Sequence, residues 1–231
     1  MLLLQAQVEQ AVTEMAENPV LTEVTEVVNE MNLWDMAVKG GWIMIVLAIL
    51  SVLCIYIFVE RLLVISKASK VDPIFMDRIR DYVKTNELKS AINFCRVTNS
   101  PASNMIEKGL ERLDRPATEV QAALDNAGNL EIAKLEKGLS IMATISSGAP
   151  MIGFLGTVLG MVKAFWEMAN AGNNIDITLL SSGIYEAMVT TVGGLIVGII
   201  AMFAYNFLVA KVDDVANTLE AQTLAFMDLK N

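Results

Sequence analysis

The residue with the clearest chemical potential is Glu186, the only charged side chain between Ile177 and Ala210. An ionised carboxylate at the centre of a bilayer costs about 2.5–3.5 kcal/mol or more, so the loss of water favours the protonated form. The next cation along the segment is Lys211, about seven turns away, so no partner lies on the same helix. We therefore predict that Glu186 gains and loses protons inside a membrane. The alternative is a protonated glutamate that only hydrogen-bonds to a neighbouring helix.

Three threonines lie where a hydroxyl could relay a proton. Thr190 follows Glu186 by one helical turn on the same face, and Thr191 is one position further round. Thr157 lies midway along the preceding apolar segment. Because a hydroxyl both donates and accepts a hydrogen bond, these residues could pass protons or hold water. The alternative is equally open, because threonine hydroxyls in membrane helices often bond to the carbonyl four residues earlier.

Lys163 is the only charged residue between Ile141 and Trp166. A long basic side chain near a helix end can extend to the membrane interface. We favour that interpretation, and a part in the proton chemistry is the alternative.

Composition excludes several other chemistries. The chain has no histidine, which removes Ser-His-Asp and Cys-His catalysis and the commonest metal ligand. It has no phosphate-binding loop, and the charged residues of the central region lack the spacing of metal ligands. The net charge of -9 argues against nucleic acid as a partner. Cys54 and Cys95 lie in different environments, so we expect no disulfide. We expect no enzymatic activity, no metal and no cofactor.

Apolar residues make up 54% of the 231 residues and are concentrated in three long stretches. We assign membrane-spanning helices to residues 42–63, 141–168 and 177–209. Each reaches the ~20 residues that cross a ~30 Å hydrocarbon core at about 1.5 Å per residue. The sequence therefore predicts an all-α membrane protein with three transmembrane helices, the second and third of which extend into a cytoplasmic helical domain.

Four segments remain outside the membrane: an acidic N-terminal segment 1–41, a charged central domain 64–140, a turn 169–176 and a tail 210–231. The N-terminal segment has apolar residues at helical spacing, so it is either an amphipathic helix on the membrane surface or a tail. Its first residues, MLLLQAQ, are too short for a signal peptide, and we expect them in the mature chain.

The central domain is predicted to be helical. Asp72-Pro73 is typical of a helix start, and residues 99–101 and 114–116 indicate breaks between helices. Two apolar stripes at helical spacing follow, Leu88, Ala91, Ile92 and Cys95 in one and Met105, Ile106, Leu110 and Leu113 in the other. Asp176 is a plausible cap for the third membrane helix.

The second and third membrane helices are expected to project beyond the membrane. Thr118 and Gln121 fit a capping box, and from there a helical pattern continues into the second span, which predicts one helix of about 50 residues. Pro150 is expected to kink it. After the third span an apolar stripe continues through the tail, formed by Leu208, Val212, Val215, Leu219 and Phe226.

Small residues line one face of each of these two helices. They are Ala149, Gly153, Gly156, Gly160 and Ala164 on the second, and Gly183, Ala187, Thr190, Gly194, Gly198 and Ala201 on the third. Spacings of three and four place each set on one side of its helix, where small residues permit close helix contact. We interpret both faces as packing surfaces, within the chain or between copies.

Topology follows from charge. Of the 17 Lys and Arg residues, 13 fall between Arg61 and Lys137. Because positive loops stay inside, we place the central domain and the C-terminus in the cytoplasm and the N-terminus in the periplasm. Trp34, Trp42 and Trp166 then share the outer interface, as an aromatic belt would.

Two motifs carry a family resemblance: APMIGFLGTVLGMVKAF at Ala149–Phe165 and GIYEAMVTTVGGL at Gly183–Leu195. With them the chain resembles the ExbB/TolQ/MotA proton-channel family, and ExbB-type members most of all. The likeness runs from about Trp42 to the end and includes Glu60-Arg61, Ser100-Pro101, LEKGL and Tyr205-Asn206. The count of three spans favours ExbB or TolQ, since MotA has four.

The resemblance implies a homopentamer in the bacterial inner membrane around single-span segments of an ExbD- or TolR-like partner. In that family the proton-motive force drives relative motion of the two subunits and so energises a TonB- or TolA-like protein. By motif position, Glu186 matches the family's pore glutamate, and Thr157 and Thr191 match its pore threonines. The partner would supply an aspartate.

The chain departs from the family pattern at two places. Ile199-Ile200 stands where many members have Ile-Pro, which predicts a straighter third helix, and Tyr185 replaces a common alanine and narrows its site. Beside the proton-driven motor, two other classes stay open: a membrane scaffold held by small-residue packing, and a membrane enzyme, for which no catalytic pair is present. An ExbB role in nutrient import is the leading interpretation, with a TolQ role in envelope maintenance as the alternative, and the lone carboxyl favours H⁺ over Na⁺.

Overall fold

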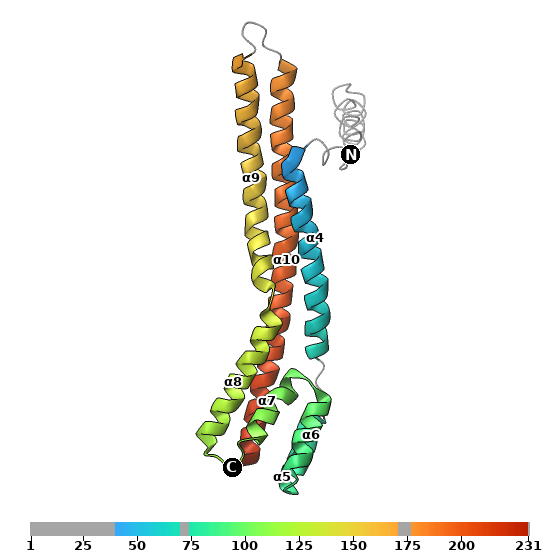
Figure 1. Cartoon of the computed structure of the whole chain (residues 1–231), viewed down its shortest axis with the longest axis vertical. Helices are drawn as coiled ribbons and strands as arrows, with labels where there is room; N and C mark the ends of the chain where they lie inside the picture. Colours follow the sequence, from blue (N-terminus) through green and yellow to red (C-terminus); the bar gives the residue numbers. More distant parts are fainter. Residues whose placement is uncertain (1–39, 70–73, 171–176, 231) are drawn as a thin grey trace, which may run out of the picture. The chain divides into compact units, whose positions relative to one another are not determined.

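The computed structural model describes residues 40–69, 74–170 and 177–230. Every regular element in these ranges is an α-helix, seven in all, and the described part of the chain has no strand (Figure 1). The predicted surface helix within 1–39, the helix start at Asp72-Pro73 and the cap at Asp176 lie outside the described residues. The all-α prediction is confirmed.

Three helices are long and apolar enough to cross a membrane, as predicted. They are α4 (Gly41–Ala68), α9 (Leu139–Asn170) and α10 (Ile177–Lys230). Each extends past the assigned apolar stretch; α4, for example, continues beyond Leu63 to Ala68. The reason is that Glu and Arg are good helix formers, so a pair such as Glu60-Arg61 marks the end of an apolar run and not the end of a helix.

Four shorter helices lie between α4 and α9: α5 (Phe75–Lys84), α6 (Leu88–Thr98), α7 (Pro101–Leu110) and α8 (Ala117–Glu136). The predicted breaks between them are confirmed. Asn99 adopts the left-handed conformation with φ 46°, and Ser100 then caps α7 in a reciprocal capping box with Ser103. Such a box satisfies two backbone donors at the helix start, and Pro101 follows where a donor is not needed.

Two details of the predicted second helix were wrong. The residue before α8 is Pro116, and Thr118 forms no capping box because it lies inside the first turn. The expected continuous helix is interrupted at Lys137-Gly138, where Gly138 has φ +90°. Only glycine adopts that conformation without strain, so the chain stops α8 there and starts α9 in a new direction. Pro150 lies inside α9 without ending it, and the kink stays a prediction.

The chain divides into two compact units, and α4, α9 and α10 contribute to both. The described residues of the first unit are 40–47, 152–170 and 177–194. Those of the second are 48–69, 74–151 and 195–230. Each unit is described separately below.

The second unit holds a core beneath the short helices. The tail stripe predicted from sequence is buried throughout: Leu208, Val212, Val215, Leu219 and Phe226. From the stripe of α7, Met105, Ile106 and Leu110 are also buried, as are Ala91 and Cys95 of α6. A Cβ at Gly109 would lie 2.6 Å from Leu124 and 3.0 Å from Phe226, so α7, α8 and α10 meet at this glycine.

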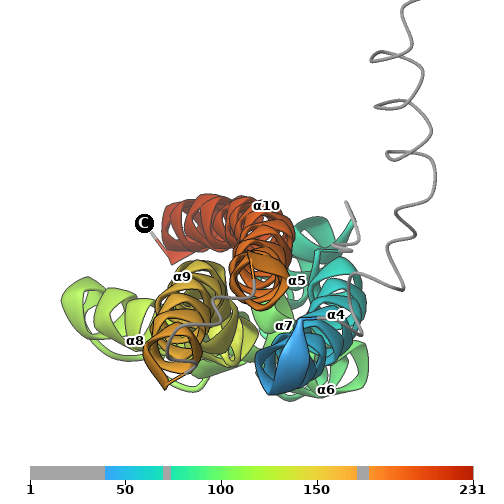
Figure 2. The same cartoon turned by 90° about the horizontal axis from the view of Figure 1, so that it is seen from above.

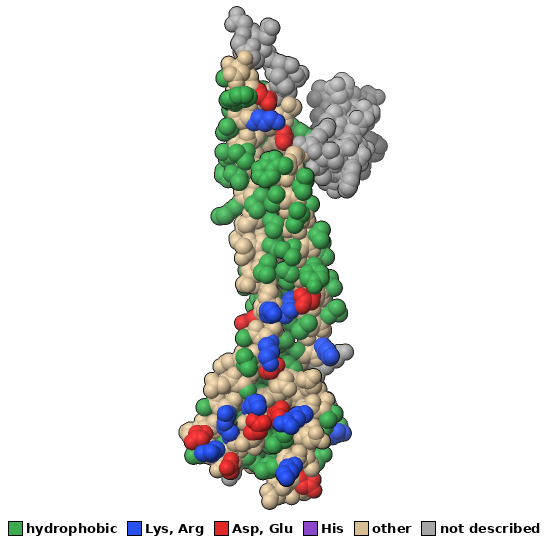
Figure 3. All heavy atoms as spheres, viewed as in Figure 1, with side chains coloured by type: hydrophobic (Ala, Val, Ile, Leu, Met, Phe, Trp, Pro, Cys, Tyr) green, Lys and Arg blue, Asp and Glu red, His purple; other side chains and the backbone are tan. Residues whose placement is uncertain are grey.

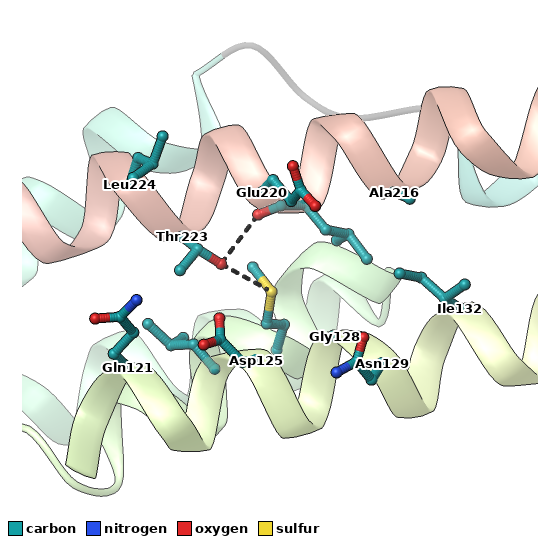
Figure 4. Close-up of a pocket in the computed structure, with 12 residues that line it drawn as sticks. Gln121, Asp125, Gly128, Asn129, Ile132, Ala216, Glu220, Thr223 and Leu224 are labelled. Carbon is teal, nitrogen blue, oxygen red and sulfur yellow. Dashed lines mark hydrogen bonds between the residues drawn. The ribbon is translucent and has the colours of Figure 1, made fainter. Parts of the chain in front are cut away.

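Polar contacts also join helices of the second unit. The Lys230 ammonium donates to the carbonyls of Leu113 (3.0 Å) and Arg115, which ties the end of α10 to the turn before α8. Thr223 donates to the Met105 sulfur at 3.4 Å (Figure 4). Side chains of α8 and α10 line a groove of about 480 Å³ around this contact.

The surface side chains of the short helices differ in polarity from those of the long helices. On the face drawn in Figure 3, charged side chains gather over the short helices, whereas hydrophobic side chains dominate the long ones. Trp42, Val52, Met151 and Phe203 are each at least 65% exposed. A soluble protein would not leave so many large apolar side chains in water, so these surfaces fit contact with lipid or with other membrane helices.

We predict that the thiol of Cys95 is chemically silent in the folded protein. Burial and the nearby carboxylate of Glu107 raise the pKa of Cys95 to about 12. Near pH 8 its thiolate is then about a thousandfold scarcer than that of an ordinary cysteine. In a Cys54→Ser variant, where Cys95 is the only thiol, alkylation by iodoacetamide should be slow until denaturant is added. Rapid alkylation of the native protein would contradict the burial of Cys95 in this core.

Candidate functional site

In the first unit, α9 and α10 lie side by side and their backbones nearly touch (Figures 1 and 2). A Cβ at Gly153 would lie 2.8 Å from the carbonyl oxygen of Thr190 and 3.0 Å from Cα of Gly194. A Cβ at Gly160 would lie 2.8 Å from Cβ of Ala187. Real Cβ atoms do not approach other atoms so closely, so the helices can pack at this distance only because glycine has no side chain.

The other small residues lie at the same kind of contact. A Cβ at Gly183 would lie 2.7 Å from Cβ of Ala164, and one at Gly156 would lie 2.4 Å from the hydroxyl oxygen of Thr190. In the second unit, a Cβ at Gly198 would lie 2.5 Å from the ring of Pro150. Each of these pairs joins one residue of α9 to one of α10.

Three hydroxyls gather where the two helices are closest. The hydroxyls of Thr157 and Thr191 hydrogen-bond to one another across the helix pair. Both also lie within reach of the Gly153 carbonyl, at 3.3 Å and 3.2 Å. Thr190, only 2% exposed, donates to the Ala187 carbonyl at 2.7 Å and lies 3.4 Å from the same Gly153 oxygen. We call Thr157, Thr190 and Thr191 the hydroxyl cluster.

Glu186 lies beside this cluster and not within it. Its carboxyl lines a cavity of about 120 Å³ together with Thr190 from its own helix and Gly156, Gly160 and Lys163 from α9. Residues of α4 complete the lining. A cavity of this volume has room for several water molecules, to which the Glu186 carboxyl and the Thr190 hydroxyl offer hydrogen bonds. Thr190 is therefore the one member of the hydroxyl cluster that the cavity reaches.

The carboxyl has no ion-pair partner within 4.0 Å among the described residues. Lys163 lines the same cavity, is exposed, and forms none of the described salt bridges. A buried glutamate in the second unit is treated differently: Glu131 accepts from Lys134 at 2.6 Å and from Asn104 at 3.3 Å. Glu131 is thus held by two side-chain donors, whereas Glu186 has no such side-chain partner among the described residues.

The contribution of α4 was not predicted from sequence. Gly40, Trp42 and Ile43 line the cavity, and a Cβ at Gly41 would lie 2.3 Å from Oε1 of Glu186. The residues are far apart along the chain, so periodicity could not have joined them. The one available signal was the Gly40-Gly41 pair directly before an apolar helix, which indicates a special backbone conformation or a close approach.

The arrangement combines a carboxyl, a water-sized cavity and a chain of hydroxyls inside the apolar part of the protein. Ionisable side chains within membrane-spanning helices are usually kept for function. The hydroxyls can donate and accept in turn, but the shared Gly153 oxygen only accepts. The geometry therefore suits passage of protons more than binding of a metal or of a large ligand.

Comparison with known proteins gives a consistent result. Residues 97–221, more than half of the chain, match the MotA/TolQ/ExbB proton channel family. A biopolymer transport protein ExbB homologue of Methanothermobacter thermautotrophicus is 28% identical over 80% of this chain and 66% of its own length. The Tol-Pal system protein TolQ of Haemophilus influenzae is 27% identical over 86% of this chain and 92% of its own. The biopolymer transport protein ExbB of Neisseria meningitidis is 26% identical over 72% of this chain and 80% of its own length.

We predict that Gly153→Ala weakens the contact between α9 and α10. The added methyl meets backbone atoms of the opposite helix, which cannot rotate away, so the cost should be about 1–3 kcal/mol of unfolding free energy. The matched control is Gly148→Ala on the same helix, where a Cβ meets nothing within 4 Å in the described chain. Denaturation in mild detergent, followed by circular dichroism, should separate the two variants. Equal stabilities would show that close approach at Gly153 is not needed.

Proposed function

This chain belongs to the MotA/TolQ/ExbB proton channel family, and on that premise we propose that it is the proton-conducting subunit of an ExbB-type motor. In the proposed function it uses the proton-motive force to energise a TonB-dependent outer-membrane transport system. Glu186 accepts the proton, Thr190 connects its cavity to the other hydroxyls, and the Thr157–Thr191 pair extends the path between the helices.

One observation carries this proposal: a carboxyl inside an apolar helix pair lines a water-sized cavity and has no ion-pair partner among the described residues. A carboxyl that served only packing would be expected to have a partner, as Glu131 has in Lys134 and Asn104. Leaving a carboxyl in this state costs stability. Such a cost is typical of groups that are kept for function.

The hydroxyl cluster links the Glu186 cavity to the Thr157–Thr191 pair through one shared acceptor. Thr190 lines the cavity, and the hydroxyls of Thr190, Thr157 and Thr191 all lie within reach of the Gly153 carbonyl oxygen. Rotation of one hydroxyl exchanges its donor and acceptor roles without movement of the backbone. Because the Gly153 oxygen only accepts, transfer between Thr190 and the Thr157–Thr191 pair would require a bridging water molecule and no change in the close glycine contacts.

The motor needs partners, which we propose by analogy with the named relatives. We propose a homopentamer in the bacterial inner membrane with the N-terminus in the periplasm and the C-terminus in the cytoplasm. A single-span ExbD- or TolR-like subunit would stand against the exposed apolar faces of the long helices and supply the second proton-carrying carboxyl. A TonB- or TolA-like protein would receive the energy.

A second candidate function is the TolQ role in a Tol-Pal system. It is favoured by the length match, because the Haemophilus influenzae TolQ is covered over 92% of its length, against 80% for the Neisseria meningitidis ExbB. Both roles use the same proton site and differ in the receiving protein. Co-purification of the intact complex followed by mass spectrometry would identify the small partner and the copy number.

We predict that Glu186→Gln abolishes proton-driven work but not assembly. The amide keeps the size and hydrogen bonding of the side chain but cannot ionise, so proton flux should fall on the order of a hundredfold or more. The measurement is pH change inside proteoliposomes that contain the purified complex under an imposed membrane potential. The matched control is Glu136→Gln, at an exposed position of α8, which should behave as wild type.

A conducting Glu186→Gln complex would contradict the motor and leave the scaffold interpretation. Loss of assembly in that variant would instead point to a structural glutamate. Gel filtration of the detergent-solubilised complex decides which of these has happened before any flux is measured.

We further predict that Thr157→Val and Thr191→Val each lower proton flux by about three- to tenfold, the effect of one lost hydrogen bond. Valine keeps the shape but removes the hydroxyl. Because the two side chains bond to one another, the double variant should cost less than the product of the single effects. Thr144→Val is the control, since Thr144 is exposed and bonds only to the Ser140 carbonyl of its own helix. If the fall in proton flux of the double variant equals the product of the two single falls, the two hydroxyls do not act as a unit.

A further inference from the structure

The first turn of α4 lies directly against the Glu186 carboxyl. A Cβ built on Gly41 would lie 2.3 Å from Oε1 and 3.5 Å from Cδ of Glu186. No other described glycine has a carboxylate oxygen as its nearest neighbour. The carboxyl therefore occupies space that any side chain at position 41 would need.

The backbone conformation of Gly41 is also unusual. Gly41 has φ +65°, in the left-handed region that other residues rarely adopt, and it is the first residue of α4. The first backbone N–H groups of a helix have no partner within the helix, and the helix dipole makes this end electropositive. A glycine here both turns the chain into α4 and exposes its first turn to the carboxyl.

The surrounding charges are few. Gly40, directly before α4, and Trp42 and Ile43 within α4 line the cavity, and none of them carries an ionisable side chain. From α9 the cavity receives one cation, Lys163, and on α10 Tyr185 is adjacent to Glu186 in sequence. Among the described elements, α4 therefore contributes backbone and not charge.

We propose that Gly41 is the positioning residue of the proton site: it lets the first turn of α4 pack against the Glu186 carboxyl, so that α4 and the carboxyl hold one another in place. This inference rests on the proposed function and extends it from α9 and α10 to α4. A proton that arrives at Glu186 changes what α4 packs against.

The test is the reaction of Glu186 with dicyclohexylcarbodiimide, a hydrophobic reagent that labels membrane carboxyls, in the purified full-length protein. Gly41→Ala should raise the labelling rate by about tenfold, the change that accompanies loss of one favourable helix-terminus interaction. Peptide mass spectrometry identifies the labelled residue. The control is Gly193→Ala, which adds the same methyl between α10 and α4 but meets the flexible Met44 side chain, at 3.0 Å.

A second variant separates the steric effect from backbone strain. Asparagine tolerates positive φ better than alanine but still has a Cβ. If Gly41 acts by leaving room for the carboxyl, Gly41→Asn should raise labelling as Gly41→Ala does, and it carries the test if the alanine variant fails to assemble. If Gly41 serves only the turn, Gly41→Asn should label like wild type.

Wild-type labelling in Gly41→Asn, or an equal rise in Gly193→Ala, would overturn the proposal. A shorter acid offers a positive check, because Glu186→Asp withdraws the carboxyl by one methylene from position 41. In the Glu186→Asp background, proteins with Gly41 and with Gly41→Ala should therefore be labelled at the same rate. Labelling needs neither a partner nor an energised membrane. Failure here is therefore distinguishable from failure of the motor, which the flux of Glu186→Gln reports.

Discussion

The chemistry of this protein depends on how closely the backbones of α9 and α10 approach one another. At Gly153 and Gly160 the opposite helix lies where a side chain would otherwise stand. That distance brings the hydroxyls of Thr157 and Thr191 into contact and places a carbonyl of one helix within reach of hydroxyls from the other. In an apolar medium such polar contacts are stronger than in water, and unpaired polar groups are more costly. Packing and polar chemistry therefore share one interface, and neither can be altered without the other.

Two buried or half-buried glutamates show how local partners decide a carboxyl's role. Glu131 is paired with Lys134 and bonded by Asn104, so two side chains fix its position within the helical core. Glu186 instead faces a cavity that is otherwise lined by glycines, apolar side chains, the Thr190 hydroxyl and Lys163, and it forms no ion pair within 4.0 Å among the described residues. The same residue type is therefore tied to neighbouring side chains in one unit and left facing a cavity in the other.

The elements that sequence predicted well are those that follow from periodicity and length. Three apolar stretches became three long helices, and the stripe from Leu208 to Phe226 is buried as its spacing required. The break at Gly138 was missed because LEKGL consists mostly of good helix formers, and only the backbone angle reveals that its glycine ends α8. The prediction of a capping box at Thr118 was wrong because α8 already begins at Ala117, directly after Pro116, so Thr118 lies inside the helix.

The candidate site was predictable only in part. Glu186 stands out by its charge in an apolar run, and Thr157 and Thr191 stand out as hydroxyls in apolar segments that also match the family motif. Sequence alone could not show that these two hydroxyls touch, or that the cavity beside Glu186 includes Thr190 but neither of them. The approach of Gly41 to the carboxyl joins residues far apart in the chain. Such contacts depend on tertiary packing, which local patterns do not encode.

The left-handed glycine at position 138 has a consequence for how this chain can vary through evolution. In an unbroken α-helix each inserted or deleted residue rotates everything beyond it by about 100°. Because Gly138 separates α8 from α9, a length change in the turn between them can be absorbed there, and the face that α9 presents keeps its phase. The tail of α10 has no such joint from Leu208 to Phe226, so a single deletion there would turn part of its buried stripe outwards. Natural length variation should therefore collect in the turns that flank α8 and avoid α10.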